Sequence, residues 1–582
     1  MQSGPFISMS AHRRDRGSVF NAVVDRFERN LPLLALIIVA LLTIYPGMSR
    51  LPLLDRDEPR FSRATVEMVE RDDWVVPYFN DEYRFDKPPL TYWWMAWNYQ
   101  IFGQTELGAR FHSLVSTILV AWLIWAFVSR FLDPGNAVAA AVAWITCAQV
   151  FQHGRLALAD MPLIASITAT HLAMYRLWLD PEPTRIPWFW WTTLYLSLAI
   201  GFFAKGPLAF LCPLMTILAF RWIFWRRGTK LTSWRPLPGL LISVGLIALW
   251  GIPALRQTQG LFWDVGIGTH VVDRGTSAFN DRSFTPWFYF ISIFVSLFPW
   301  LPRLTSGWVD CARTWSIERA FLWSWAMGPY LIFMFYATQL PHYTLPAFPA
   351  LLLLGYSNDG GTEKTWLGNA TKALYLLVIF FVLAFGVLAM FISSPGPERE
   401  FGWAVLWFGV TLFAFGMFAH FRNRRQYLAS YFALALIGTG AFFFAAQARA
   451  LGATREVGAF LESNARDGRG LGVRILEPSL VFYGNRFWDF SRYDTDWLEI
   501  IDEKKPSAIL LLKREHNLIP ALVPGLFTKV GQEVPKPKRD FSEEVDGFQP
   551  PDGYLSTPIQ GINFARPSWV ELELWYLPKY GN

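Results

Sequence analysis

Apolar runs of about 18–22 residues recur along the chain, and this is the length that a helix needs to cross the hydrocarbon core of a bilayer. Lipid offers the backbone no hydrogen bonds, so runs of this kind must be helical. Hydrophobic residues are 53% of the 582 residues, a high share for a soluble protein. The sequence therefore predicts an α-helical polytopic membrane protein with about thirteen transmembrane helices. We expect these spans near residues 31–49, 109–132, 136–152, 161–180, 187–204, 206–225, 237–255, 286–301, 320–337, 344–357, 372–393, 402–420 and 427–447.

Lysine and arginine are concentrated in alternate loops, and this distribution sets the orientation of the spans. The N-terminal tail, residues 1–30, is rich in arginine, and the loops "RWIFWRRGTKLTSWR" and "FRNRRQ" are also basic. We therefore place the tail and these loops in the cytoplasm of a bacterial cell and the opposite loops in the periplasm. Because topology explains the net charge of +6, we expect no nucleic-acid partner.

The chain divides into a predicted cytoplasmic tail over 1–30, a transmembrane domain over 31–447 and a periplasmic α/β domain over 448–582. An odd number of spans exports this last domain. In it, "TREVGAFLESNARDG" and "DWLEIIDEKK" have helical patterns, while "GVRILE", "SLVFYG" and "SAILLLKR" have strand patterns. The first periplasmic loop, residues 50–108, contains the amphipathic "PRFSRATVEMVERDD" and the Trp-rich "PLTYWWMAWNYQIF". We expect this loop to lie along the membrane surface.

Acids lie near the membrane at two places on the periplasmic side. Asp57 and Glu58, with Arg60, directly follow the first span, and Asp160 opens the fourth. Each acid can cap a helix N-terminus, and the Met-Pro after Asp160 favours that role. The density of charge after the first span exceeds what a cap needs, and charges close to the membrane are functional candidates by default. We therefore treat Asp57, Asp160 and Glu58 as catalytic candidates.

Cations gather on the same side. Lys87 stands before two prolines in "RFDKPPL", Lys205 ends the fifth span in "FAKGPL", and Arg274 lies in the long polar loop 256–285. A lone outward lysine is often only a snorkelling anchor, and Tyr343 in "QLPHYTLP" fits an interfacial belt residue. As a set, these side chains suit a phosphate, because cations offset its charge where water is partly excluded.

A site on this side of the membrane has no access to cytoplasmic nucleotide sugars. A lipid phosphate that arrives through the bilayer fits better, so the residues predict transfer of a group from a lipid-linked phosphate to an outside acceptor. No P-loop, GxSxG or HExxH motif supports ATP hydrolysis, an α/β-hydrolase or a zinc protease. The three cysteines show neither a disulfide framework nor a metal spacing.

Five segments carry a family resemblance: "DEPRFSRATVEMVERDDWVVPYFNDEYRFDKPPLTYW", "LALADMPL", "FAKGPLAF", "SFTPWFYFISIFVSLFPWLP" and "LPHYTLPAFPALLLL". In this order, over roughly residues 30–360, they resemble the GT-C superfamily of membrane glycosyltransferases. The nearer branch holds the protein O-mannosyltransferases and the lipid A aminoarabinose transferases. The resemblance implies a GT-C fold and a polyprenyl-phosphate sugar donor, such as undecaprenyl phosphate.

The resemblance also implies roles for single residues. Asp57 matches the essential acid of the first outer loop, with Glu58 beside it, and Asp160 matches the second acid. Lys87 matches the residue that binds the polyprenyl phosphate, and Tyr343 matches a tyrosine near that phosphate. The residues assigned to the donor phosphate are Lys87, Arg60, Arg274, Tyr343 and Lys205.

Relatives in this branch can bind a divalent metal, zinc or magnesium, beside an acid and a loop histidine. The counterparts here are Asp86 and His270, and no other cofactor is implied. Two positions depart from the usual pattern of the aminoarabinose transferases, because Asp86 replaces a glutamate and Gln339 replaces a lysine. Both changes affect which sugar the protein is expected to transfer, since an aminosugar and a neutral or acidic sugar require different partner side chains.

The resemblance favours lipid A or lipopolysaccharide as the acceptor, with a protein hydroxyl or another envelope glycan as alternatives. A phosphate monoester already carries a nucleophilic oxygen, whereas a hydroxyl needs a base such as Asp57. A transporter or flippase of lipid-linked sugar is a different class, but the sequence shows neither internal repeats nor charges near the bilayer midplane. A membrane scaffold leaves the charges after the first span unexplained. We expect a monomer surrounded by membrane lipids.

Overall fold

The computed structural model describes residues 32–49, 51–54, 56–128, 134–179, 187–224, 234–273, 285, 287–298, 300–357, 370, 373, 452–492, 497–517, 536–563 and 568–579. The predicted spans 402–420 and 427–447, and all but one residue of 372–393, lie outside these residues. Arg274 lies outside them as well. The predicted number of thirteen spans therefore stays a prediction.

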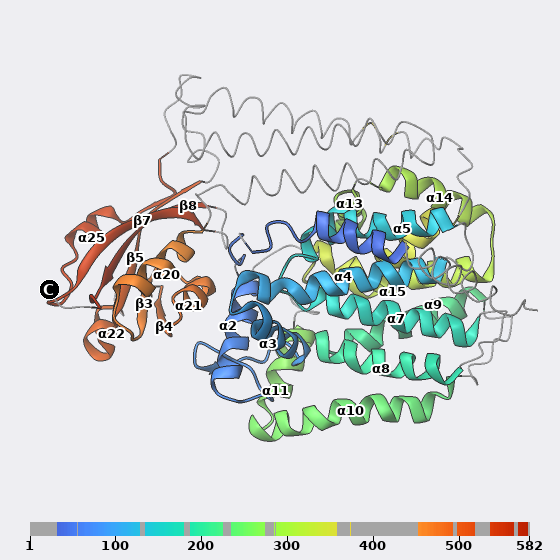
Figure 1. Ribbon diagram of the computed structural model, residues 1–582, viewed down its shortest axis with the longest axis horizontal. Coiled ribbons are helices and arrows are strands. Elements are labelled where there is room, and N and C mark those ends of the chain that lie inside the picture. The colour runs from blue at the N-terminus through green and yellow to red at the C-terminus, as the bar shows by residue number, and fades with distance from the viewer. Residues whose placement is uncertain are drawn as a thin grey trace, which may run out of the picture.

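A bundle of apolar helices forms the larger part of the molecule (Figure 1). Within the described residues, the helices over Glu106–Phe127 and Pro236–Gln257 are long and apolar enough to cross a membrane by length and composition. Neighbouring pairs in the bundle are α7 with α8, α9 with α15, and α4 with α7 and α5. The bundle helices are Pro32–Thr43, α4 (Glu106–Val128), α5 (Pro134–Thr146), α6 (Ala148–His153), α7 (Asp160–Trp178), α8 (Pro187–Lys205), α9 (Leu208–Phe224), α10 (Pro236–Gln257), α15 (Ile317–Phe333) and α16 (Phe348–Tyr356).

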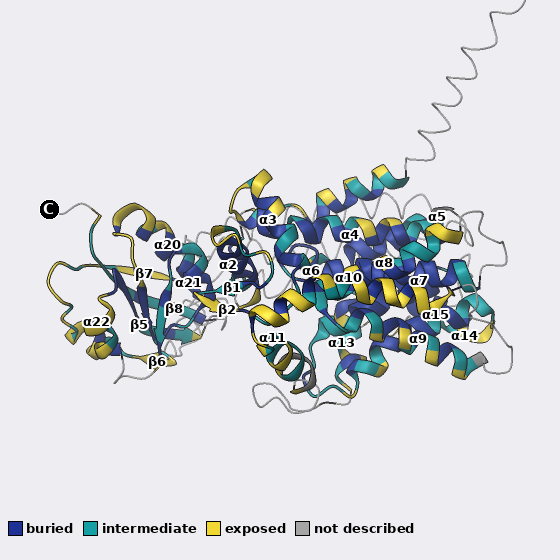
Figure 2. Ribbon diagram, turned by 90° about the horizontal axis from the view of Figure 1, so that it is seen from below, coloured by how far each residue is buried: buried dark blue, intermediate teal, exposed yellow. Residues whose placement is uncertain are grey.

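Helix α10 lies at the edge of the bundle and leaves apolar side chains uncovered (Figure 2). Leu237, Leu241 and Leu249 are between 64% and 75% exposed. An exposed row of leucines is unfavourable in water but matches lipid tails, so this face is suited to the membrane.

One predicted span differs in the structure. The span near 286–301 is a nine-residue helix, α13 (Phe288–Ser296), which is too short to cross a bilayer by itself. After a turn, α14 (Leu301–Arg313) follows where we expected a cytoplasmic loop. Its apolar side packs on α16, and the indole Nε1 of Trp308 donates to the carbonyl of Leu351 at 2.8 Å.

The first outer loop contains α2 (Asp57–Glu70), a hairpin of β1 (Tyr78–Phe79) and β2 (Glu82–Tyr83), and α3 (Leu90–Phe102). Both helices were predicted, but the position of α2 was not. Instead of lying along the membrane surface, α2 is buried over most of its length between α3 and the C-terminal domain. Figure 1 shows it between the helical bundle and the sheet. The amphipathic spacing predicted helix α2 correctly. The side of α2 that was expected to face lipid packs against the C-terminal domain instead.

The described C-terminal residues contain helices and a six-stranded sheet of order β4-β3-β5-β8-β7, with β6 paired to β5. Strands β3, β4 and β5 are parallel, and β8 is antiparallel to β5 and β7. The predicted strand "SLVFYG" is instead helix α21, because Pro478 occupies its first turn. The elements are α20 (Ala453–Asn464), β3 (Gly470–Val473), α21 (Pro478–Tyr483), β4 (Trp488–Ser491), α22 (Trp497–Lys504), β5 (Ala508–Asn517), β6 (Arg539–Asp540), α25 (Ser542–Gly547), β7 (Leu555–Asn563) and β8 (Ser568–Tyr576).

Hydrogen bonds join this domain to the first outer loop. The hydroxyl of Tyr483 accepts from the backbone N–H of Leu53 at 2.7 Å. The Asn80 amide bonds both ways to the backbone of Trp488, donating to its carbonyl and accepting from its N–H, each at 2.8 Å. These bonds fix α2 and its hairpin against the sheet.

Candidate functional site

Glu58, in the first turn of α2, is 1% exposed. Its two carboxylate oxygens accept from Nε and Nη2 of Arg110, each at 2.8 Å. They also accept from the backbone N–H groups of Leu54 at 2.8 Å and Ala157 at 2.6 Å. The carboxylate thus ties α2 to α4 and to the turn before α7. Because protein groups occupy it from all these sides, Glu58 is a structural anchor, and this geometry does not support the catalytic role predicted for it.

The variant Arg110→Met is expected to lower the free energy of unfolding by about 3–5 kcal/mol, because it leaves the Glu58 charge buried without its partner. The same guanidinium donates to the carbonyls of Met48, Leu51 and Pro52, which lose their donor too. Thermal unfolding in detergent measures the effect. Adding Glu58→Gln to the variant removes the stranded charge and is expected to restore part of the loss. A Tm equal to the wild type in Arg110→Met contradicts the anchor role.

Asp57 and Arg60 lie on the outer edge of α2, with Asp57 exposed and Arg60 half-buried one turn later. Burial lowers the pKa of Arg60, as does the nearby Arg84 charge, while Asp57 and Asp86 oppose this shift. Arg84 is buried, its Nη1 lies 2.7 Å from Oδ2 of Asp86, and its Nε donates to the hydroxyl of Tyr92 at 3.0 Å. These contacts define an α2 cluster of two acids and two arginines: Asp57, Arg60, Arg84 and Asp86.

A second group, the helix-end cluster, consists of Asp160, Lys205 and Tyr343. Asp160 is the first residue of α7, Lys205 is the last of α8, and Tyr343 belongs to a 3-10 turn, η5 (Pro341–Ala347). The Nζ of Lys205 lies 2.6 Å from Oδ1 of Asp160 and 5.6 Å from the centre of the Tyr343 ring. The structure thus brings together three predicted residues that are up to 183 positions apart in the sequence.

Lys87 lies next to the α2 cluster. Its Nζ donates to the backbone carbonyl of Asp86 at 2.8 Å. Burial lowers the pKa of His342 to about 3; Asp160 opposes this shift, whereas the charges of Lys205 and Lys87 add to it. The Lys87 charge therefore acts on the turn that carries Tyr343. His342 is neutral at physiological pH.

The metal site predicted at Asp86 and His270 stays a prediction. Asp86 is paired with Arg84, and His270 lies in a π-helix, η3 (Asp264–Asp273), whose described part does not include its side chain. No group of three or more His, Cys, Asp or Glu side chains in the described ranges is placed to hold a metal ion. We assign no chemical step to a metal.

Sequence reasoning missed Arg84 and Arg110, which hold Asp86 and Glu58. Arg110 and Glu58 are 52 positions apart, so no local pattern links them, and nothing in the sequence marks Arg84 as the partner of the nearby Asp86. The one available signal was that both arginines lie on the side predicted to be periplasmic, where positive charge is expected to be scarce.

Comparison with known proteins gives three agreeing results. Residues 86–252 match the family model described as dolichyl-phosphate-mannose-protein mannosyltransferase. An undecaprenyl phosphate-alpha-4-amino-4-deoxy-L-arabinose arabinosyl transferase of Yersinia pestis is 30% identical over 397 residues, which cover 66% of this chain and 69% of the relative. A protein of the same name from Pectobacterium atrosepticum is 29% identical over 323 residues, covering 55% and 57%.

Two solved structures share the fold. Apo ArnT from Cupriavidus metallidurans has a TM-score of 0.69 at 14% identity, and the match covers 85% of this chain and 93% of that protein. The same protein bound to undecaprenyl phosphate has a TM-score of 0.68 at 14% identity, with 96% and 98% covered. The likeness confirms the predicted helical core of a polytopic membrane protein.

The sequence relatives establish more than the fold, since the Yersinia pestis relative is 30% identical and 69% of its length is covered. They are glycosyltransferases, and this confirms the predicted enzyme class. The chain belongs to the undecaprenyl phosphate-alpha-4-amino-4-deoxy-L-arabinose arabinosyl transferase family, within the GT-C superfamily of membrane glycosyltransferases.

Proposed function

We propose that the protein transfers 4-amino-4-deoxy-L-arabinose from undecaprenyl phosphate to lipid A or lipopolysaccharide at the periplasmic face of the inner membrane. The observation that carries this proposal is the 30% identity to relatives named for that sugar and that lipid carrier. The solved structure with undecaprenyl phosphate supports the same class of donor for this fold. The cations of the α2 and helix-end clusters can offset the negative charge of a lipid phosphate.

In the proposed reaction, an acceptor oxygen forms a bond to the anomeric carbon of the sugar. The bond from that carbon to the donor phosphate breaks, its electron pair passes to the phosphate oxygen, and undecaprenyl phosphate leaves. Lys87 and Arg60 face the leaving phosphate from one side, and Lys205 with Tyr343 from the other. Fixed cations stabilise the charge that develops there. A phosphate acceptor needs no base, so Asp57 stabilises the positive charge of the sugar ring.

Asp160 has a supporting role in this scheme. Its carboxylate lies 2.6 Å from Nζ of Lys205 and so holds the ammonium group beside the Tyr343 ring. A lysine side chain has many rotamers, and a buried acid partner reduces the entropy that is lost when the lysine binds a phosphate. Asp160 therefore positions the donor-binding lysine.

The proposal includes the topology. Residues 1–30 lie in the cytoplasm, residues 31–447 form the transmembrane domain, and the site and residues 448–582 lie in the periplasm. Basic loops on the opposite side support this orientation. Arg274 completes the donor-phosphate set from the loop after η3, and the protein acts as a monomer.

A protein hydroxyl is the second candidate acceptor, and the match of residues 86–252 to a protein mannosyltransferase family favours it. That reaction releases a proton, which Asp57 would accept as a general base. The exposed position of Asp57 at the start of α2 is compatible with either acceptor.

The test is transfer by purified full-length protein from undecaprenyl phosphate-aminoarabinose to lipid A in detergent micelles, read by mass spectrometry of the lipid. We expect lipid A to gain the mass of one sugar residue. A panel of other polyprenyl-phosphate sugars and an unfolded protein acceptor serve as parallel arms. An unchanged lipid A mass together with a modified protein would replace the proposal by the second candidate.

A further inference from the structure

A polar cavity of about 460 Å³ lies between the first outer loop and the sheet of the C-terminal domain. This size is within the range of ligand pockets in proteins. One wall comes from the start of α2 and from the β1–β2 hairpin, through Arg56, Arg60 and Asn80. The other wall comes from the ends of β3, β4 and β5. The cavity therefore exists only because the two parts are joined.

The sheet topology explains why a hollow forms there. Strands β3 and β4 are parallel neighbours, so their carboxyl ends lie at the same edge of the sheet. Helix α21 follows β3 and helix α22 follows β4, and the two helices pack on opposite faces of the sheet. Leu480 of α21 packs with Leu510 on one face, whereas Trp497 of α22 packs with Leu511 on the other. Such a divergence opens a crevice at the carboxyl ends of the strands, which is where open α/β sheets bind ligands.

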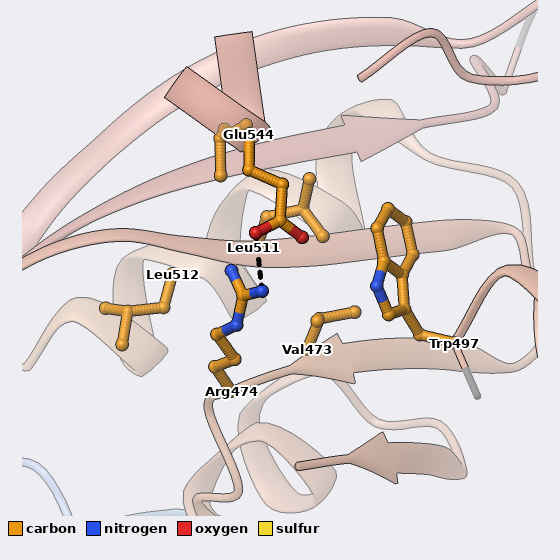
Figure 3. Close-up of a pocket in the computed structure, with 7 residues that line it drawn as sticks. Val473, Arg474, Trp497, Leu511, Leu512 and Glu544 are labelled. Carbon is orange, nitrogen blue, oxygen red and sulfur yellow. Dashed lines mark hydrogen bonds and ion pairs between the residues drawn. The ribbon is translucent and has the colours of Figure 1, made fainter. Parts of the chain in front are cut away.

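The arginines of this crevice are of two kinds. Arg474 directly follows β3, and its Nη2 lies 2.6 Å from Oε2 of Glu544. Figure 3, which draws another pocket that Arg474 also lines, marks this ion pair with a dashed line. By contrast, Arg56, Arg60 and Arg492 also line the cavity, and within the described part of the chain none of them has an ion-pair partner. The acids Glu82, Glu477, Asp489 and Glu515 also line the cavity, and Asp57 and Asp86 lie near Arg60. Three arginines that form no ion pair nevertheless favour an anion with several oxygens.

Two buried polar atoms indicate that a ligand of this cavity also forms hydrogen bonds to uncharged groups or to a carboxylate. Glu515 is 3% exposed and Trp488 is 1% exposed, and both line the cavity. Oε1 of Glu515 and Nε1 of Trp488 have no hydrogen-bond partner among the described residues. Buried polar atoms are nearly always paired, so each needs a partner of its own. A sugar hydroxyl can donate to the carboxylate and accept from the indole N–H.

We propose that this cavity binds the phosphorylated saccharide headgroup of the acceptor. The inference rests on the proposed function and specifies where its acceptor is held. Arg492 and Arg56 bind a phosphate of the headgroup, while Glu515 and Trp488 contact the sugar ring. Arg60 belongs both to this cavity and to the α2 cluster, so a second phosphate of the headgroup lies beside Asp57, where the nucleophile is required.

The first test measures binding alone, by calorimetry with full-length protein and a soluble bisphosphorylated glucosamine disaccharide without acyl chains. The variant is Arg492→Gln, which changes an exposed residue outside the donor site. The control is Arg466→Gln, an exposed arginine of the same domain that does not line the cavity. We expect the Kd to rise about tenfold in Arg492→Gln and to stay unchanged in the control. An equal Kd in both variants overturns the inference.

Inorganic pyrophosphate is the second probe. It carries the phosphate charge without the sugar, and we expect it to bind at least about tenfold more weakly than the disaccharide, because it leaves Glu515 and Trp488 unpaired. Equal binding of the two probes would mean that the cavity recognises free phosphate, and this would also overturn the inference.

Kinetics separates this inference from the proposed function. In Arg492→Gln, the KM for lipid A is expected to rise about tenfold, with the KM for the donor unchanged. Transfer with an unaltered KM for lipid A would refute the acceptor cavity while the proposed function stands. If the wild type transfers no sugar to lipid A, the proposed function fails, and the binding measurements still decide what the cavity holds.

Discussion

Replacing Lys87 by alanine is expected to lower the kcat/KM for the polyprenyl-phosphate sugar by about 10²–10³-fold. The donor phosphate gains negative charge as its bond to the sugar breaks. In the proposed function Lys87 binds that phosphate, and the bond from its Nζ to the Asp86 carbonyl, at 2.8 Å, holds the ammonium group in place. An ammonium group that is already in place stabilises the charge without reorganisation. Initial rates against donor concentration, at fixed lipid A, measure the loss.

The matched control is Lys87→Arg, which keeps a cation on the same backbone. It is expected to retain more activity than Lys87→Ala, although the planar guanidinium does not place its charge as an ammonium does. Thermal unfolding of both variants in detergent separates lost catalysis from lost folding. If stable Lys87→Ala protein keeps the wild-type kcat/KM, the donor phosphate binds elsewhere.

Asp57→Asn is expected to lower kcat by about 10²–10³-fold with little change in the KM for the donor. Glycosyl transfer passes through a state in which the sugar ring is positively charged, as in glycoside hydrolysis. A carboxylate stabilises that charge, and an amide of the same shape does not. Because the charge exists only in the transition state, ground-state binding of the donor is unaffected. Steady-state kinetics with saturating lipid A gives both constants.

Asp72→Asn is the control for this substitution. Asp72 is another exposed acid of the same loop, just after α2, and its Oδ1 accepts from Nε1 of Trp74 at 2.8 Å. Its φ of 53° is a value that asparagine tolerates. We expect wild-type kcat in Asp72→Asn. A loss of the same size in both variants would mean that Asp57 acts through the overall charge of the loop and not at the sugar.

Helices that rest on hydrophobic periodicity were predictable from the sequence. The predicted spans near 161–180 and 187–204 agree with α7 (Asp160–Trp178) and α8 (Pro187–Lys205) within a few residues. The predictions of secondary structure failed where tertiary contacts determine the conformation of a segment. "SLVFYG" has the composition of a strand, but it forms α21 because its apolar residues pack on the sheet from outside.

The candidate site was predictable as a set of residues on one side of the membrane, but not as a geometry. The positive-inside rule placed Asp160 and Lys205 on the same side, and the structure adds their 2.6 Å contact. Nothing in the sequence distinguished Glu58 from Asp57, since adjacent positions on a helix differ by about 100° in direction. That rotation turns Glu58 to Arg110 and leaves Asp57 exposed.

The bonds between the sheet domain and the first outer loop also set an order of events during synthesis. Leu53 and its hydrogen-bond partner Tyr483 are 430 residues apart, and Asn80 and Trp488 are 408 apart. At roughly 5–20 residues per second, α2 leaves the ribosome roughly 20–90 s before the residues that cover it. During that interval the helices of the bundle can insert, but α2 lacks its second neighbour. In the proposed topology, the enzyme would therefore mature late, when the C-terminal sheet docks at the periplasmic face, and a chain halted before that step would lack the outer support of α2.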